Sequence, residues 1–170
     1  MTGQVGPDGA SVTTVLSRTV TLTDAEIKTL PSVPIILVPA TETLNYSGLP
    51  SQLPLPLAFS VSLDTSAGGY GNVDLDARYV LALGSDWSYN AMSVLYSNVA
   101  QLNQSVSQIG IANTYDSQVQ PNSQILPLRL SSGVLLDNAL GIAFNNPGNL
   151  TDGNVNNSMK VTVYYVIADL

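Results

Sequence analysis

Cysteine and histidine are both absent from this 170-residue chain. Without cysteine there is no disulfide, no cysteine-ligated zinc or iron–sulfur site and no thiol nucleophile. Without histidine, Ser-His-Asp and Cys-His catalysis, His-ligated zinc and proton transfer tuned near neutral pH are excluded as well. Only paired carboxylates, lysine or tyrosine remain for catalysis, and we expect a structural protein rather than an enzyme.

Charge is also scarce. Charged residues make up 10% of the chain, against about a quarter in an ordinary soluble domain. Five Lys plus Arg stand against twelve Asp plus Glu, a net charge of −7, so we expect no nucleic-acid partner. A surface with so few charges is typical of one that is buried against other chains, which favours an assembly subunit. The alternative is a secreted β domain with a bland polar face.

The amino-terminal residues contain neither a basic start nor an apolar run, so we expect no signal peptide and no membrane span. Residues 1–14 are rich in Gly, Ser and Thr, and we expect them to form a flexible arm. One domain, residues 15–170, accounts for the rest of the chain.

Alternating apolar and polar residues predict most of the domain to be β-strand. Leu16, Val20 and Leu22 alternate with Ser17, Thr19 and Thr21, and Arg18 is the one misfit on the apolar side. The same period occurs in residues 58–64 and, most clearly, in residues 160–168. Further strands are expected at residues 34–39, 78–83, 125–130 and 134–145.

Two segments interrupt this pattern. Thr23 and Glu26 have the spacing of a capping box, which predicts a short helix over residues 24–30 that ends at Pro31. Residues 86–103 lack Gly and Pro and show helical spacing, so we expect a second helix there, although Val94 and Tyr96 suit a strand nearly as well. Prolines between residues 40 and 57 predict a loop or an edge segment.

The fold class that follows is all-β. Several short strands separated by turns, one short helix and no βαβ rhythm predict an antiparallel β-sandwich of jelly-roll type.

The sequence contains no convincing catalytic, cofactor or metal site. Asp64, Asp74 and Asp76 flank the glycine-rich turn at residues 67–72, but their spacing matches no cation loop, and we expect aspartates that face water. The glycines lack the lysine and the strand-to-helix context of a phosphate-binding loop, so we expect an ordinary turn.

Aromatic residues in polar, turn-like stretches are the candidate interface. Tyrosine combines a large apolar area with a polar tip and is enriched at protein interfaces. We therefore select Tyr46, Tyr70, Trp87, Tyr89 and Tyr115. They could equally cap the ends of the sandwich, and an aromatic row could also stack sugars.

Three stretches of the chain resemble a family of small structural proteins from the virions of tailed bacteriophages. These stretches are residues 19–31 (TVTLTDAEIKTLP), 69–74 (GYGNVD) and 148–166 (GNLTDGN, then NSMKVTVYYV). After the first strand, where the family pattern has a glycine-rich stretch, this chain instead has residues 41–56.

The resemblance implies a decoration (cement) protein on the head of the phage. Such a protein would bind the major capsid protein as a homo-oligomer, with a trimer favoured, and would be assembled in the host cytoplasm onto the capsid surface of the virion. Two alternatives stay open: a tail-fibre or spike head that binds host surface glycans, and a hydrolase that uses carboxylates alone.

Overall fold

The computed structural model describes residues 14–41, 51–74, 78–83, 91–96, 105–111 and 137–169. Within these ranges the chain is mostly β-strand with one short helix, as the sequence predicts. The elements are β1 (Leu16–Thr23), α1 (Asp24–Thr29), β2 (Ile35–Val38), β3 (Gln52–Asp64), β4 (Tyr70–Gly71), β5 (Arg78–Leu83), β6 (Ala91–Tyr96), β7 (Val106–Ile111), β8 (Leu140–Asn145), β9 (Thr151–Asp152) and β10 (Ser158–Asp169).

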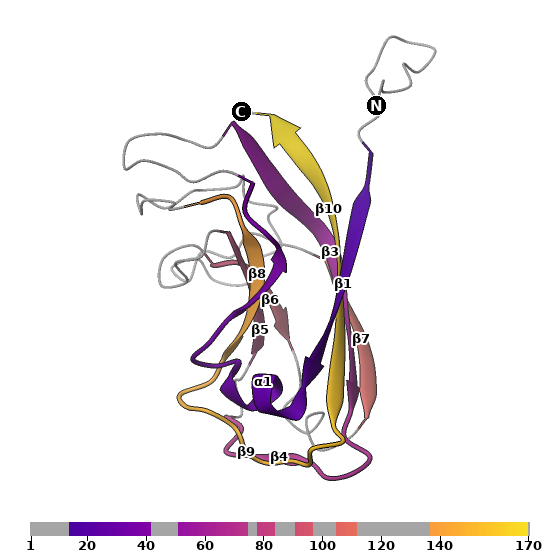
Figure 1. Ribbon diagram of the computed structural model, residues 1–170, viewed down its shortest axis with the longest axis vertical. Helices are drawn as coiled ribbons and strands as arrows, with labels where there is room; N and C mark the ends of the chain where they lie inside the picture. Colours follow the sequence, from indigo (N-terminus) through magenta and orange to yellow (C-terminus); the bar gives the residue numbers. More distant parts are fainter. Residues whose placement is uncertain are drawn as a thin grey trace.

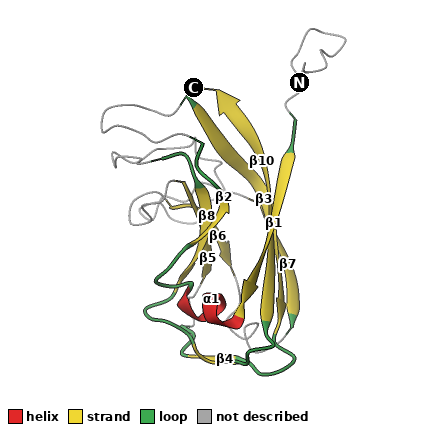
Figure 2. Cartoon of the chain, in the orientation of Figure 1, coloured by secondary structure: helices red, strands yellow, loops and turns green. Residues whose placement is uncertain are grey.

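The described strands form two four-stranded sheets and one small pair, all antiparallel. One sheet has the order β1-β10-β3-β7 and the other β2-β8-β5-β6, while β4 pairs with β9. Figure 1 shows the two larger sheets facing each other, with α1, β4 and β9 closing one end. The start of β1 and the end of β10 lie toward the opposite end (Figure 2).

The pairing of the longer strands is nested. β1 pairs with β10, β2 with β8, β3 with β7 and β5 with β6. In the sequence, each pair of strands thus lies between the two strands of the next outer pair. This is the pairing of one long antiparallel hairpin that is folded into two sheets. Successive pairs fall alternately into the two sheets.

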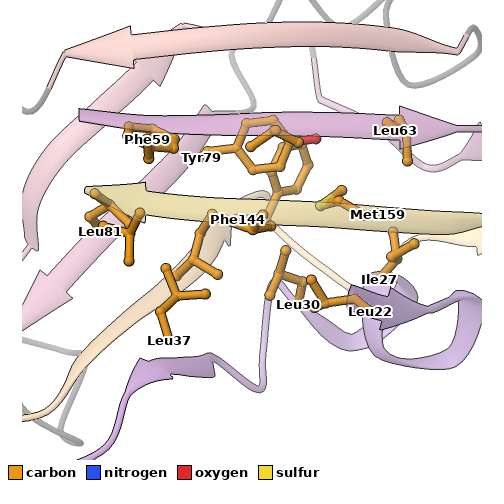
Figure 3. Packing of buried hydrophobic residues seen from close by; sticks show 14 of the residues in the cluster. Leu22, Ile27, Leu30, Leu37, Phe59, Leu63, Tyr79, Leu81, Phe144 and Met159 are labelled. Atoms are coloured by element: carbon orange, nitrogen blue, oxygen red, sulfur yellow. The ribbon is translucent and has the colours of Figure 1, made fainter. Parts of the chain in front are cut away.

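The core lies between the two sheets and continues to the helix. Val161 and Val163 of β10 are fully buried, as are Leu140 and Ile142 of β8 in the facing sheet. Tyr79 and Phe144 pack with their ring centroids 5.2 Å apart and tilted by 55°. Figure 3 shows these rings near Phe59, with Leu22, Ile27 and Leu30 extending the cluster toward α1.

The capping box of α1 forms as its spacing predicts. The Glu26 carboxylate accepts a hydrogen bond from the Thr23 backbone N–H at 2.8 Å, and the Glu26 N–H donates to the Thr23 hydroxyl at 3.5 Å. The helix ends before Pro31, whose ring cannot continue it. Ile27 and Leu30 are buried, so this single turn and a half anchors the chain as it passes between the sheets.

The second helix expected over residues 86–103 is wrong for its described part. Residues 91–96 form β6, and Val94 and Tyr96 lie opposite Val80 and Arg78 of β5. The segment forms a strand because β5 provides backbone hydrogen-bond partners for it. The helical spacing of its apolar residues alone provides no comparable stabilisation. Residues 86–90 and 97–103 lie outside the described ranges.

Residues 52–57, the strand part of the proline-rich stretch that the structure describes, form an edge segment rather than a loop. β3 starts at Gln52 and contains Pro54 and Pro56, which pair with Ile167 and Tyr165 of β10. β7 pairs with residues 58–63 and stops before the prolines, so no described strand needs a donor from them on that side. A register shift opposite Tyr164 and Tyr165 leaves Leu57 as the extra residue of a bulge.

Other expectations need smaller corrections. β2 is only partly buried, because Leu37 has no exposed surface but Ile36 is 38% exposed. β8 begins at Leu140, later than the predicted residue 134, and residues 125–130 lie outside the described ranges. In the glycine-rich turn, only Gly68 among the glycines takes a positive φ, 151°, while Asn72 takes 54°.

Candidate functional site

The outer face of the β1-β10-β3-β7 sheet is lined by hydroxyl groups. Directly opposite residues of an antiparallel sheet share a face, so the register defines which side chains lie together. Thr19 lies opposite Thr162 of β10, which lies opposite Ser60 of β3. By the same register, the face carries Ser17, Thr19, Thr21, Thr23, Ser158, Thr162, Ser60, Ser62 and Ser107. We call this surface the hydroxyl face.

The hydroxyls on this face contact one another across strands. The Thr19 and Thr162 hydroxyl oxygens are 2.8 Å apart, and the Ser107 hydroxyl donates to that of Ser62 at 3.3 Å. Each hydroxyl has one donor and two acceptor sites, so capacity remains for a partner. Ser17, Thr19, Thr21, Ser62 and Ser107 are all exposed. Rows of fixed hydroxyls on a broad sheet suit another protein surface better than a small ligand, which needs a concave site.

Two charges interrupt the hydroxyl face. Lys160 lies between Thr21 and Ser62 and is exposed. Asp64 lies at the end of the face, where its carboxylate accepts hydrogen bonds from the Ser66 N–H at 2.9 Å and from the Ser105 hydroxyl at 3.2 Å. These bonds, the Ser66 N–H first, hold the pKa of Asp64 below its ordinary value. Asp64 is thus a turn residue facing water.

The far end of the same sheet carries several exposed apolar side chains, next to the exposed Gln52–Asp169 pair. Tyr164 follows the hydroxyls of β10 on the outer face and is 42% exposed. Leu57 at the bulge, Ile167 near the end of β10, and Val15 and Leu16 at the start of β1 are also exposed. We call the start of β1, the start of β3 and the end of β10 the open end. An exposed apolar cluster beside a polar sheet face is typical of a protein-binding surface.

Tyr70, one of the candidate interface residues, is buried in this structure. Its side chain is only 3% exposed, and its hydroxyl lies beside the Asp24 carboxylate and the Asn157 amide. Burial raises the pKa of Tyr70 above its ordinary value, and the Asp24 charge adds to this effect. The turn that contains Tyr70 is folded inward by the β4–β9 pair, so an aromatic residue beside glycines became part of the core.

The other candidate aromatics, Tyr46, Trp87, Tyr89 and Tyr115, lie outside the described residues. Tyr164 is an exposed aromatic that the interface prediction missed, although the period-two pattern of residues 160–168 already placed it on the polar side. The signal was therefore available from alternation alone.

The described residues contain no group of three His, Cys, Asp or Glu side chains placed to hold a metal ion. Asp74 uses its backbone N–H to donate to the Asn146 amide oxygen at 2.8 Å, and Asp76 lies outside the described ranges. None of the helices in the described ranges is long and apolar enough to cross a bilayer.

The three stretches that the sequence analysis singled out meet in one structural unit. Residues 19–31 form most of β1 and α1, residues 69–74 contain β4, and residues 148–166 contain β9 and most of β10. The Leu150 N–H donates to the Lys28 carbonyl at 2.9 Å, and the Gly153 N–H donates to the Gly69 carbonyl at 3.0 Å. We call α1, the 65–74 turn and residues 148–157 the base.

Comparisons with known proteins add no support to the resemblance that the sequence analysis described. The chain matches no protein-family model, no curated protein and no solved structure.

Proposed function

We propose that the chain is a jelly roll. In such a fold, an antiparallel hairpin of eight strands is wound so that its successive strand pairs alternate between two sheets. Numbering the longer described strands from one to eight gives sheet orders 1-8-3-6 and 2-7-4-5, which is the order that this winding produces. Jelly rolls are frequent among viral shell proteins, which supports a place in a virion.

We propose that the protein decorates the head of a tailed bacteriophage and stabilises its shell. The observation that carries this proposal is the exposed hydroxyl face, on which the register of β1, β10 and β3 places only Lys160 and Asp64 as charged residues, together with the exposed apolar side chains at the open end. Such a face suits a flat protein partner, here the major capsid protein. The resemblance of the base to small phage virion proteins supports the same location on the phage head.

The mechanism is mass action. A protein that binds only the expanded shell lowers the free energy of that state by its binding free energy, and the effect is repeated at every site on the particle. An oligomer would add avidity by engaging neighbouring capsid subunits at once. Stabilisation needs no catalytic residue, in keeping with a chain that lacks histidine and cysteine.

Co-sedimentation with empty phage heads that lack the protein tests the proposal. We expect saturable binding with a symmetric number of copies per particle. Ser62→Glu places a charge in the middle of the hydroxyl face and should weaken binding at least tenfold. Val155→Glu is the matched control, because Val155 is 84% exposed in the base, away from that face.

Lack of binding by the wild-type protein would contradict the proposal. Binding to a glycan array would then support a tail-fibre or spike head instead. Equal binding by the Ser62→Glu and Val155→Glu variants would keep the shell as partner but remove the hydroxyl face as the contact.

A further inference from the structure

The outer edge of β1 lacks most of the features that normally prevent strand addition, and Arg18 is its one charged residue. β1 lies at one end of its sheet, and among the described residues only β10 pairs with it. The register runs from Leu16 opposite Tyr165 to Thr23 opposite Ser158 without a bulge. β1 contains no proline, glycine or lysine, and its residues 16–19 are all exposed. Natural edge strands usually carry at least one such protection.

Elsewhere in the same sheet the chain does protect an edge. β3 continues beyond the reach of β7, and this extension contains Pro54 and Pro56. Prolines two residues apart remove donors from the same side of a strand, which blocks pairing there. Two prolines block pairing there, whereas β1 carries only the single charge of Arg18, and this difference indicates that the edge of β1 is used.

We propose that β1 pairs antiparallel with β1 of a second copy, so that two four-stranded sheets join into one. The side chains of β1 are suited to pairing with β1 of a second copy. Its outward residues all carry hydroxyls, and a hydroxyl pair of this kind already links Thr19 to Thr162 at 2.8 Å. Its inward residues are apolar apart from Arg18.

Symmetry restricts the register. A two-fold axis normal to the sheet keeps the same face outward in both copies. Opposite residues must therefore both point outward or both point inward. This condition is met only when the axis passes midway between the two copies of a single residue. An axis at Arg18 would place two arginines opposite each other, which is unfavourable. An axis at Thr19 pairs all of residues 16–22 and covers the exposed side chain of Leu16. An axis at Val20 leaves Leu16 without an opposite residue.

The pairing enlarges the surface proposed to bind the shell. Both hydroxyl faces point the same way across the two-fold axis, so the dimer presents one continuous face of twice the width. This use of the dimer rests on the proposed function, whereas the pairing itself rests on β1 and is tested without any shell.

Single cysteines test the register cleanly, because the chain has no cysteine of its own. Directly opposite residues have Cα atoms about 5 Å apart, within the range of a disulfide. We expect Thr19→Cys to form a disulfide-linked dimer under mild oxidation. Thr21→Cys is the control, since four residues of offset place its two copies about 13 Å apart. Sedimentation of the wild-type protein should show an even number of subunits.

A monomer or an isolated trimer in the wild-type sedimentation would overturn the inference. Equal linking of the Thr19→Cys and Thr21→Cys variants would also overturn it, because random collisions do not discriminate between them. Thr19→Lys adds an independent test, since two lysines would face each other at the axis. We expect at least tenfold weaker dimerisation with unchanged thermal unfolding, compared with Ser17→Lys, whose copies do not meet. Wild-type dimerisation by Thr19→Lys would contradict the register.

Discussion

The base and the open end lie at opposite ends of the same long strands but differ in how their side chains are used. At the base, Leu22 of β1 and Met159 of β10 lie opposite each other, and at most 1% of each is exposed. At the open end of the same two strands, Leu16 is 38% exposed and Ile167 is 37% exposed. Apolar side chains thus maintain the fold at one end and remain accessible at the other.

Polar contacts sharpen the difference. In the base, the buried Asn157 amide donates to the Gly68 carbonyl at 2.7 Å, and the Asn146 amide donates to the Asn72 carbonyl at 2.9 Å. Both bonds join segments distant in sequence, and the bond of the buried Asn157 side chain is costly to lose.

The largest expected effect compares two residues of β3. Phe59 is fully buried, and truncation to alanine should lower the free energy of unfolding by about 3–5 kcal/mol, because it removes a ring and leaves a cavity. Leu57 is 43% exposed at the bulge, so Leu57→Ala should change stability by less than about 0.5 kcal/mol. Urea unfolding followed by tryptophan fluorescence measures both. A large loss for Leu57→Ala would mean that the open end is part of the folding core.

Much of this division was predictable from the sequence. Alternation correctly placed Leu22, Phe59 and Val161 inward, and the capping box located α1 to within a residue. Those signals are local, since they depend only on the period of a strand or the spacing of a cap.

The remaining features depend on pairing between distant segments. The hydroxyl face requires the register of Thr19 with Thr162, which no single strand reveals. The burial of Tyr70 depends on the β4–β9 contact across 82 residues, between Tyr70 and Asp152. The sequence did not reveal this burial, because glycine-rich flanks indicate a turn but not whether the turn folds inward.

A second comparison lies within the base. Gly153 has a φ of 73°, and a Cβ there would lie 2.6 Å from the Tyr70 ring and 2.7 Å from the Asp24 carboxylate. Gly153→Ala should therefore cost about 3 kcal/mol through backbone strain and overpacking. Gly148→Ala is the control, since its Cβ would meet only the Asn72 amide at 3.5 Å. Thermal unfolding of the pair should separate them clearly, and equal melting temperatures would show that the base yields more readily than its contacts indicate.

The smallest expected effect concerns the cap of α1, which begins the base. Thr23→Ala should cost about 1 kcal/mol, since the Glu26 N–H loses its hydrogen-bond acceptor.

Hydrogen bonds from the Thr23 N–H and hydroxyl hold the pKa of Glu26 below its ordinary value of 4.5. Because the folded state favours the ionised form, this contribution to stability is present above pH 4.5 and is lost as the pH falls through the lowered pKa. Glu26→Gln should therefore be less stable than the wild type at pH 7, and the gap should narrow below pH 4.5. Urea titrations of both proteins across this range measure the gap, and a constant gap would show that the capping box does not favour the ionised carboxylate.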